Sequence, residues 1–138
     1  MDIGDAKYIA GLFDGEGSIY YKKLFIKKKD KKKGYYTWQI RMELSMTDKD
    51  VVEWIWKSFK CGTFEKRNMT SKDIKGTRKT QWRWRCGYRD ALYVCKILWP
   101  HSKVKTQKIE QIIDHYDPYM MEGNIVSLSQ YKQTMALE

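Results

Sequence analysis

The sequence predicts an α+β fold in which an antiparallel sheet of two hairpins is backed by helices, with its elements in the order αββαββα. Three observations support this prediction: a short apolar helix near the N-terminus, two stretches in which apolar and polar residues alternate, and helical spacing of apolar residues after each stretch. Each hairpin has one apolar face and one polar or basic face. The two can therefore join as one sheet with an uncovered polar face.

The chain has 138 residues, enough for one domain with a proper core and short for two, so we expect a single domain over residues 1–138. Lys and Arg number 27 against 17 Asp and Glu, a formal charge of +10. This charge makes nucleic acid the first partner to consider and an acidic membrane surface the main alternative. No apolar run approaches the roughly 20 residues that span a bilayer, and no signal-peptide plan is visible at the N-terminus.

Cys61, Cys86 and Cys95 are odd in number and widely spaced, and the chain has only two histidines, His101 and His115. No pair among these residues has the spacing of a zinc finger or of a redox motif. We therefore expect buried thiols in a reducing compartment.

The N-terminal half is predicted as a helix followed by a hairpin. The helix covers about residues 6–14, with Asp5 as its N-cap and Gly15 in the left-handed conformation that commonly ends a helix. Apolar and polar residues then alternate over residues 37–46, which predicts a strand with one apolar face. The β-forming stretch 18–26 precedes it, and a long polar turn joins the two strands.

The second half repeats this order. Thr47 is predicted to open a helix in a capping box with Asp50, and Val104 is predicted to face inward from the last helix. The tail after Pro118 is ambiguous. The further predicted elements are strands at residues 62–67 and 80–87, followed by helices at residues 89–98 and 103–116.

Two glycines, Gly11 and Gly15, lie four residues apart on one side of the first helix. A glycine inside a helix costs about 1 kcal/mol relative to alanine, so another contact must offset the cost. Small residues at this spacing allow two copies of the helix to cross closely through a two-fold axis. Packing of this side against a strand of the same chain is the alternative. The residues predicted to lie in a dimer interface are Ala10, Gly11, Asp14 and Gly15.

Glu16 follows this helix directly, beside the negative end of the helix dipole, which is an unfavourable place for an isolated carboxylate. A bound cation would relieve the repulsion. If two copies cross at the glycines, two Glu16 side chains and nearby carbonyl oxygens converge. Hard oxygen ligands of this kind suit Mg²⁺. The alternative is a solvated loop residue.

Residues 9–17, IAGLFDGEG, resemble the signature of the LAGLIDADG homing endonucleases in their small, acidic and glycine positions, and the order of elements is similar too. The resemblance implies that the signature helix forms the interface between two halves and that its final acid binds the catalytic metal. It assigns that role to Glu16, with the Gly15 carbonyl as second ligand. Only one copy of the signature is present, which implies a homodimer acting on nearly palindromic DNA.

The same resemblance implies two further catalytic residues. Lys105 matches a basic residue near the scissile phosphate, and it stands where Ser102 would favour an acid three residues on; a surface lysine is the alternative. Asp48 matches a polar residue that orders water, although an acid at a helix start explains it almost as well. Mg²⁺ is the implied cofactor. Mn²⁺ is expected to substitute for it, and Ca²⁺ to bind without supporting efficient cleavage.

The polar sheet face is predicted to bind double-stranded DNA, so that the sheet forms a DNA-binding saddle. A run of eight lysines between residues 22 and 33 is predicted to clamp phosphates from the hairpin tip. A strand of about 11 residues at about 3.4 Å each spans roughly 37 Å, or about 11 base pairs, so that two copies cover about 22. The predicted DNA-binding residues are Tyr20, Lys22, Leu24, Lys28, Lys31, Gln39, Arg41, Glu43, Ser45, Glu65, Arg67, Gln81, Arg83 and Arg85. Lys23 and Tyr21 would then point inward, and a bulge in the first strand is the alternative.

The resemblance, together with these residues, implies an intron-encoded, metal-dependent homing endonuclease that hydrolyses one phosphodiester in each DNA strand as a homodimer. An RNA maturase or a noncatalytic DNA-binding module on the same scaffold is the alternative, and a basic ribosome-associated protein is a third. The expected partners are double-stranded DNA and a second copy, with intron RNA as a further candidate and no membrane or small-molecule substrate. We expect an intracellular location, in a prokaryotic or archaeal cytoplasm or in an organelle.

Overall fold

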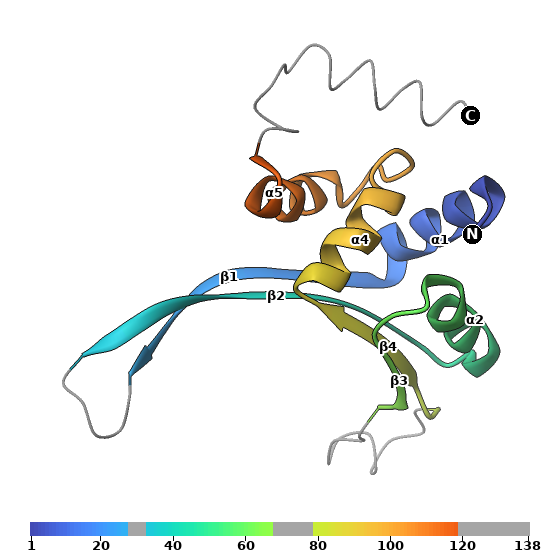
Figure 1. The fold of residues 1–138 in the computed structure, drawn as a ribbon. Coiled ribbons are helices and arrows are strands. Elements are labelled where there is room, and N and C mark those ends of the chain that lie inside the picture. Colours follow the sequence, from blue (N-terminus) through green and yellow to red (C-terminus); the bar gives the residue numbers. More distant parts are fainter. Residues whose placement is uncertain (28–32, 68–78, 119–138) are drawn as a thin grey trace.

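The computed structural model describes residues 1–27, 33–67 and 79–118, and it confirms the α+β fold and the predicted order of elements. A four-stranded antiparallel sheet has the strand order β1-β2-β4-β3. All the labelled helices lie on one side of this sheet, and its first two strands project beyond the helical layer as a long curved arm (Figure 1). The elements are α1 (Ile3–Glu16), β1 (Gly17–Lys27), β2 (Gly34–Met46), α2 (Lys49–Phe59), β3 (Thr63–Lys66), β4 (Trp82–Gly87), α4 (Arg89–Leu98) and α5 (Thr106–Tyr116).

Helix α1 is longer than predicted at both ends. Asp2 is its N-cap, and the Asp2 carboxylate accepts a 2.7 Å hydrogen bond from the backbone N–H of Asp5, so the prediction of Asp5 as the cap is wrong. Gly15 is helical rather than left-handed, and Glu16 is the last helical residue. The chain enters β1 at Gly17 in an extended conformation. A Cβ atom on Gly17 would lie 2.6 Å from the Phe13 ring, so only glycine fits this junction.

The pairing of β1 with β2 is unbroken from Gly17 opposite Leu44 to Lys27 opposite Gly34, so β1 contains no bulge. Tyr21 lies on the helical side, stacked on Trp38 with ring centroids 4.6 Å apart, as its inward prediction requires. The alternation predicted for the first hairpin is therefore correct along the whole arm.

The core fills the space between the sheet and its helices. Alternate residues of β2 and β4 are buried there, and α1, α2 and α4 cover them with apolar side chains, while α5 packs on α4 and β1. Burying one large apolar side chain contributes about 1.5–3 kcal/mol, so this single cluster supplies the main stabilisation. Its largest buried side chains are Trp84, Trp99, Phe13, Phe59, Ile9, Ile40, Met42 and Leu44.

Two predicted helix starts are wrong. The Asp48 carboxylate, not Thr47, caps α2 and accepts from the Val51 N–H at 3.1 Å, because a side chain three residues before an amide reaches it best. Helix α5 begins at Thr106, and Val104 is 73 % exposed instead of inward, since the turn before α5 is attached to the end of α1.

The three cysteines are free, and Cys86 and Cys95 are buried while Cys61 is half-buried. Burial raises the pKa of all three thiols, and the prediction of buried thiols is confirmed for Cys86 and Cys95. None of the helices within the described ranges is long and apolar enough to cross a membrane. The lysine-rich tip, the second hairpin loop and the tail after Pro118 lie outside these ranges.

The turn between α2 and β3 yields a pair of opposite stability predictions. Gly62 has φ +82°, and an added Cβ would lie 2.5 Å from the Arg85 carbonyl oxygen, so Gly62→Ala is expected to cost about 1–3 kcal/mol. Lys60 has φ 59° at the C-cap of α2, so Lys60→Gly is expected to raise the unfolding free energy by about 0.5–1 kcal/mol. Urea unfolding of both variants measures these changes, and equal stability of the two would contradict the strained turn.

Candidate functional site

The sheet face opposite the helices carries the predicted polar residues. The strand register places Tyr20 opposite Arg41 and Lys22 opposite Gln39 on this face, and Arg85 opposite Glu43. Leu24, Ser45, Glu65 and Arg83 follow by alternation. Arg67 and Gln81 extend the face beyond the β3 and β4 strands, and the Arg67 guanidinium donates a 2.7 Å hydrogen bond to the Gln81 amide oxygen. Lys28 and Lys31 lie outside the described residues.

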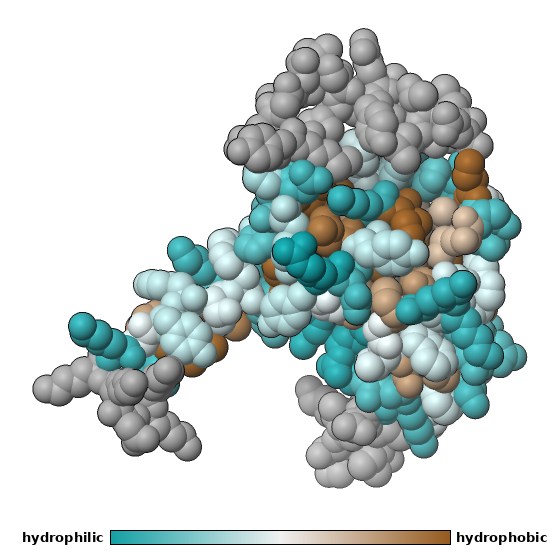
Figure 2. All heavy atoms as spheres, in the orientation of Figure 1, coloured by the Kyte–Doolittle hydropathy of each residue, from teal (hydrophilic) through white to brown (hydrophobic). Residues whose placement is uncertain are grey.

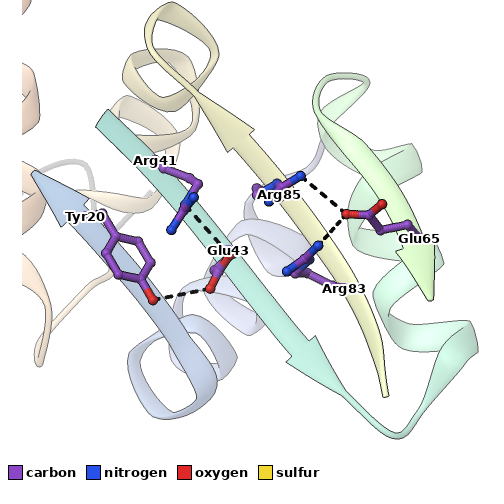
Figure 3. Close-up of polar contacts among 6 residues, drawn as sticks. All are labelled: Tyr20, Arg41, Glu43, Glu65, Arg83 and Arg85. Carbon is purple, nitrogen blue, oxygen red and sulfur yellow. Dashed lines mark hydrogen bonds and ion pairs between the residues drawn. The ribbon is translucent and has the colours of Figure 1, made fainter. Parts of the chain in front are cut away.

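Glu65 holds two arginines of β4 in place. Its carboxylate accepts a 2.6 Å hydrogen bond from Arg83 Nη2 and lies 3.4 Å from Arg85 Nη2 (Figure 3). The Arg83 hydrogen bond, assisted by the charges of both arginines, lowers the pKa of Glu65. The acid thus offsets repulsion between neighbouring arginines and orients them before any partner binds.

A second group lies on β1 and β2. The Tyr20 hydroxyl donates a 3.3 Å hydrogen bond to Glu43, and the Arg41 guanidinium lies 4.5 Å from the centre of the Tyr20 ring (Figure 3). Arg41 Nε also lies 3.9 Å from the Glu43 carboxylate. Arginine and glutamate side chains oriented on a sheet face are the groups that bind base edges in a DNA major groove.

The glycines of α1 form an open face. Gly11 and Gly15 are exposed, and a Cβ added at either position would meet no atom of the described chain within 4 Å. The alternative of packing against a strand of the same chain is therefore wrong for the described residues. Ala10 is 1 % exposed and belongs to the core, so the structure does not place its side chain on this face as predicted.

Asp14 connects the end of α1 to the turn before α5. Its carboxylate accepts hydrogen bonds from the Ser102 hydroxyl at 2.7 Å, the Lys103 N–H at 2.8 Å and the Lys105 N–H at 3.2 Å. The Asp14 side chain is therefore turned into its own chain, and its predicted place in a dimer interface stays a prediction. Burial raises the pKa of Asp14, but these hydrogen bonds outweigh it and hold the pKa below its ordinary value.

This connection brings Lys105 to the candidate site. Lys105 Nζ donates a 2.9 Å hydrogen bond to the Asp14 carbonyl oxygen, two residues before the exposed Glu16. Lys105 and the end of α1 therefore lie together, as predicted. Asp48 does not join them: it caps α2 and has no hydrogen bond or ion pair with Glu16 or Lys105 among the described contacts.

The end of α1 offers few candidate metal ligands within one chain. Within the described residues no group of three or more His, Cys, Asp or Glu could hold an ion. Glu16 contributes one carboxylate at the carbonyl end of α1, where Gly15 adds a carbonyl oxygen. Mg²⁺ needs one or two carboxylates, with water and phosphate oxygens completing its shell, so the chemistry of these two ligands fits part of a Mg²⁺ site.

The sequence could not predict the Asp14 and Ser102 contact, since the two residues are 88 positions apart. Ser102 is 3 % exposed and uses its hydroxyl on Asp14, so it does not cap α5. A lysine at position 105, where a capping Ser102 would favour an acid, is therefore explained: Ser102 does not cap the helix.

The family model for the LAGLIDADG endonuclease matches residues 9–85, more than half of the chain. The chain therefore belongs to the LAGLIDADG endonuclease family. Comparison with curated proteins finds no significant match.

Solved structures show the same fold at low sequence identity. The archaeal intron-encoded homing endonuclease I-Vdi141I, complexed with DNA, is 12 % identical with a TM-score of 0.61, covering 97 % of this chain and 80 % of that one. The homing endonuclease I-TnaI is 18 % identical with a TM-score of 0.58, covering 96 % and 85 %. I-CvuI in complex with its target and Ca²⁺ is also 18 % identical with a TM-score of 0.58, covering 97 % and 78 %.

The Asp14 contacts lead to a prediction for pH dependence. Since the folded-state pKa of Asp14 lies below the ordinary value of 3.8, its carboxylate stabilises the fold above about pH 4, and this contribution is lost as pH falls through the lowered pKa. Asp14→Asn is expected to cost about 2 kcal/mol at pH 7. The difference from the parent should shrink towards pH 3.

Urea unfolding of parent and variant at pH 7 and pH 3 measures this difference. Asp114→Asn, on the exposed side of α5, is the matched control and should change stability little at either pH. A cost of Asp14→Asn that does not depend on pH would contradict the role of the ionised carboxylate.

Proposed function

We propose that the protein is a site-specific homing endonuclease that cuts both strands of double-stranded DNA as a homodimer. One observation carries this proposal: the open glycine face of α1 ends in the exposed Glu16, with Lys105 held at the same helix end. A second copy packed on the glycines would bring two Glu16 carboxylates together. The uncovered polar sheet of each copy would then bind one half of the DNA site.

The length of the sheet supports a long, near-palindromic target. Strand β1 contains 11 residues, which at about 3.4 Å each span about 37 Å, or roughly 11 base pairs of a half-site. Two-fold symmetry of the dimer requires related sequences in the two half-sites. The formal charge of +10 supports binding to the phosphate backbone.

The chemistry is assigned to few groups. Glu16 and the Gly15 carbonyl would hold Mg²⁺, and the bound ion would supply Lewis-acid activation for hydrolysis. The Lys105 ammonium would stabilise the negative charge that develops on the reacting phosphate. Mn²⁺ would replace Mg²⁺, whereas Ca²⁺ would support binding without efficient cleavage. Asp48 is left out of this set because its carboxylate caps α2.

The biological setting is part of the proposal. An enzyme of this kind would be encoded in an intron or a similar mobile element. It would act in a prokaryotic or archaeal cytoplasm or in an organelle. The competing function is that of a protein with the same fold that binds DNA or RNA without cleaving it. Incubation of the protein with a plasmid library of candidate insertion sites, with Mg²⁺ or with chelator, separates these functions. Specific binding without cleavage in Mg²⁺ would support a regulator or a maturase.

Glu16→Gln tests the metal ligand. Loss of the carboxylate charge is expected to lower the cleavage rate about a thousandfold, while binding in Ca²⁺ stays within a few-fold of the parent. Single-turnover cleavage and gel-shift titration on the same duplex measure the two effects. Glu53→Gln on α2 is the matched control and should cut at the parental rate. A Glu16→Gln variant that also did so would exclude Glu16 from catalysis.

Gly11→Leu tests the dimer. The added side chain has open space in the single chain and improves helix propensity, so the melting temperature of the DNA-free chain at low concentration should not fall. Close approach of a second α1 becomes sterically blocked, so dimers on DNA and double-strand cleavage should be lost.

Sedimentation velocity with target duplex follows the dimer, and circular dichroism follows the fold. Gln107→Leu adds the same side chain at another exposed helical position and should leave both unchanged. A Gly11→Leu protein that still dimerises and cleaves would show that α1 is not the interface.

A further inference from the structure

The outer part of the β1–β2 arm presents a different surface from the rest of the sheet. Pairing of β2 with β4 ends at Arg41 opposite Gly87, and beyond this point only two strands continue (Figure 1). On the face shared with Arg41, the polar residues give way to Leu24, Ile26 and Tyr35, which are 38 %, 39 % and 47 % exposed. We name this surface the outer apolar patch.

The register makes the patch continuous with the polar face. Leu24 pairs with Thr37 and Ile26 pairs with Tyr35, directly after the Lys22 and Gln39 pair. Hydrophobic side chains lie along the lower edge of the projecting arm, next to hydrophilic ones (Figure 2). A single exposed apolar residue is ordinary, but neighbouring apolar residues on a functional face indicate a partner.

The surroundings of the patch select one partner. Lys22 precedes it on the same face, and the exposed Lys27 and Lys33 lie at its outer end. Fixed positive charge around the patch repels a second copy of the same surface and attracts phosphate. A DNA major groove matches both the lysines and the apolar side chains. Phosphates line its walls, and thymine is the base that presents a methyl group on its floor.

We propose that Leu24, Ile26 and Tyr35 contact thymine methyl groups in the outer part of each half-site. The inference rests on the proposed DNA-binding function. Arginine prefers guanine and glutamine prefers adenine, so the inner sheet should read base edges by hydrogen bonds. The outer patch offers apolar contact instead. Each half-site is thereby divided into an inner segment read by polar groups and an outer A·T-rich segment read by methyl contact.

The spacing along β1 locates the outer segment. Leu24 and Ile26 lie four and six residues beyond Tyr20, which corresponds to about 14–20 Å at about 3.4 Å per residue. At about 3.4 Å per base pair, the thymines should lie about four to six base pairs outward from the pair that faces Tyr20. They should occur in both half-sites, because each copy supplies one patch.

Replacement of thymine by deoxyuridine tests the proposal, since it removes the methyl group and leaves base pairing intact. Binding sites are first selected from a random duplex library with the full chain in Ca²⁺. Deoxyuridine is then placed at outer or inner thymines of a selected duplex. Each outer methyl removed should weaken binding about fourfold, as expected for loss of a buried methyl group, whereas inner replacements should have little effect.

Two variants assign the effect to the patch. Leu24→Ser combined with Ile26→Ser should abolish the outer thymine preference and the deoxyuridine effect. Tyr36→Ser is the matched control: Tyr36 is 66 % exposed on the opposite face of the same arm, and its loss should leave the deoxyuridine effect intact. If the double variant fails to fold, the deoxyuridine measurement on the parent still decides.

The outcomes separate the inference from the function on which it rests. Specific, cleavable sites without outer thymine enrichment, or with no deoxyuridine effect, would overturn the inference and leave the endonuclease intact. Selection of no specific duplex would overturn both. A change in the oligomeric state of the DNA-free protein on Leu24→Ser and Ile26→Ser substitution would show that the patch binds protein and would also overturn the inference.

Discussion

The carboxylate of Asp14 is the contact on which the candidate site depends. It lies near the end of α1 and accepts hydrogen bonds from Ser102 and from the backbone of the turn before α5. Lys105, in the same turn, donates a hydrogen bond from Nζ to the Asp14 carbonyl oxygen. Glu16 lies two residues after Asp14, and β1 begins one residue later, so this one acid sets the position of the helix end, the strand start and the lysine relative to one another.

The two faces of the sheet have different roles: one packs in the core, and the other carries the polar residues. Residues on the helical side are buried in one core, and the residues between them face the uncovered side. On that side Glu65 and Glu43 hold arginines whose charges would otherwise repel each other. The acids keep the half-buried arginines ordered, so less side-chain entropy would be lost if base edges replaced the glutamates as partners on DNA.

The glycines of α1 lower the stability of the helix in a single chain. Gly11 and Gly15 weaken the helix in a single chain, and the described residues offer no contact that compensates. Within the described residues, Glu16 is likewise not part of a group of three or more His, Cys, Asp or Glu that could hold an ion. The second copy that we propose would explain both features.

The sequence by itself determined the order of elements, the two faces of the sheet and the stretch that ends in Glu16, because these depend on local periodicity and on a short motif. It placed Tyr21 inward and Tyr20 outward correctly, since strand alternation needs no tertiary knowledge. It misplaced the caps of α1 and α2, where neighbouring polar residues (Asp2 and Asp5, Thr47 and Asp48) are alternative caps and only the folded geometry selects one. The role of Asp14 and the exposure of Val104 were decided by tertiary structure, because hydrogen bonds between segments 88 to 91 residues apart leave no periodic signal in the chain.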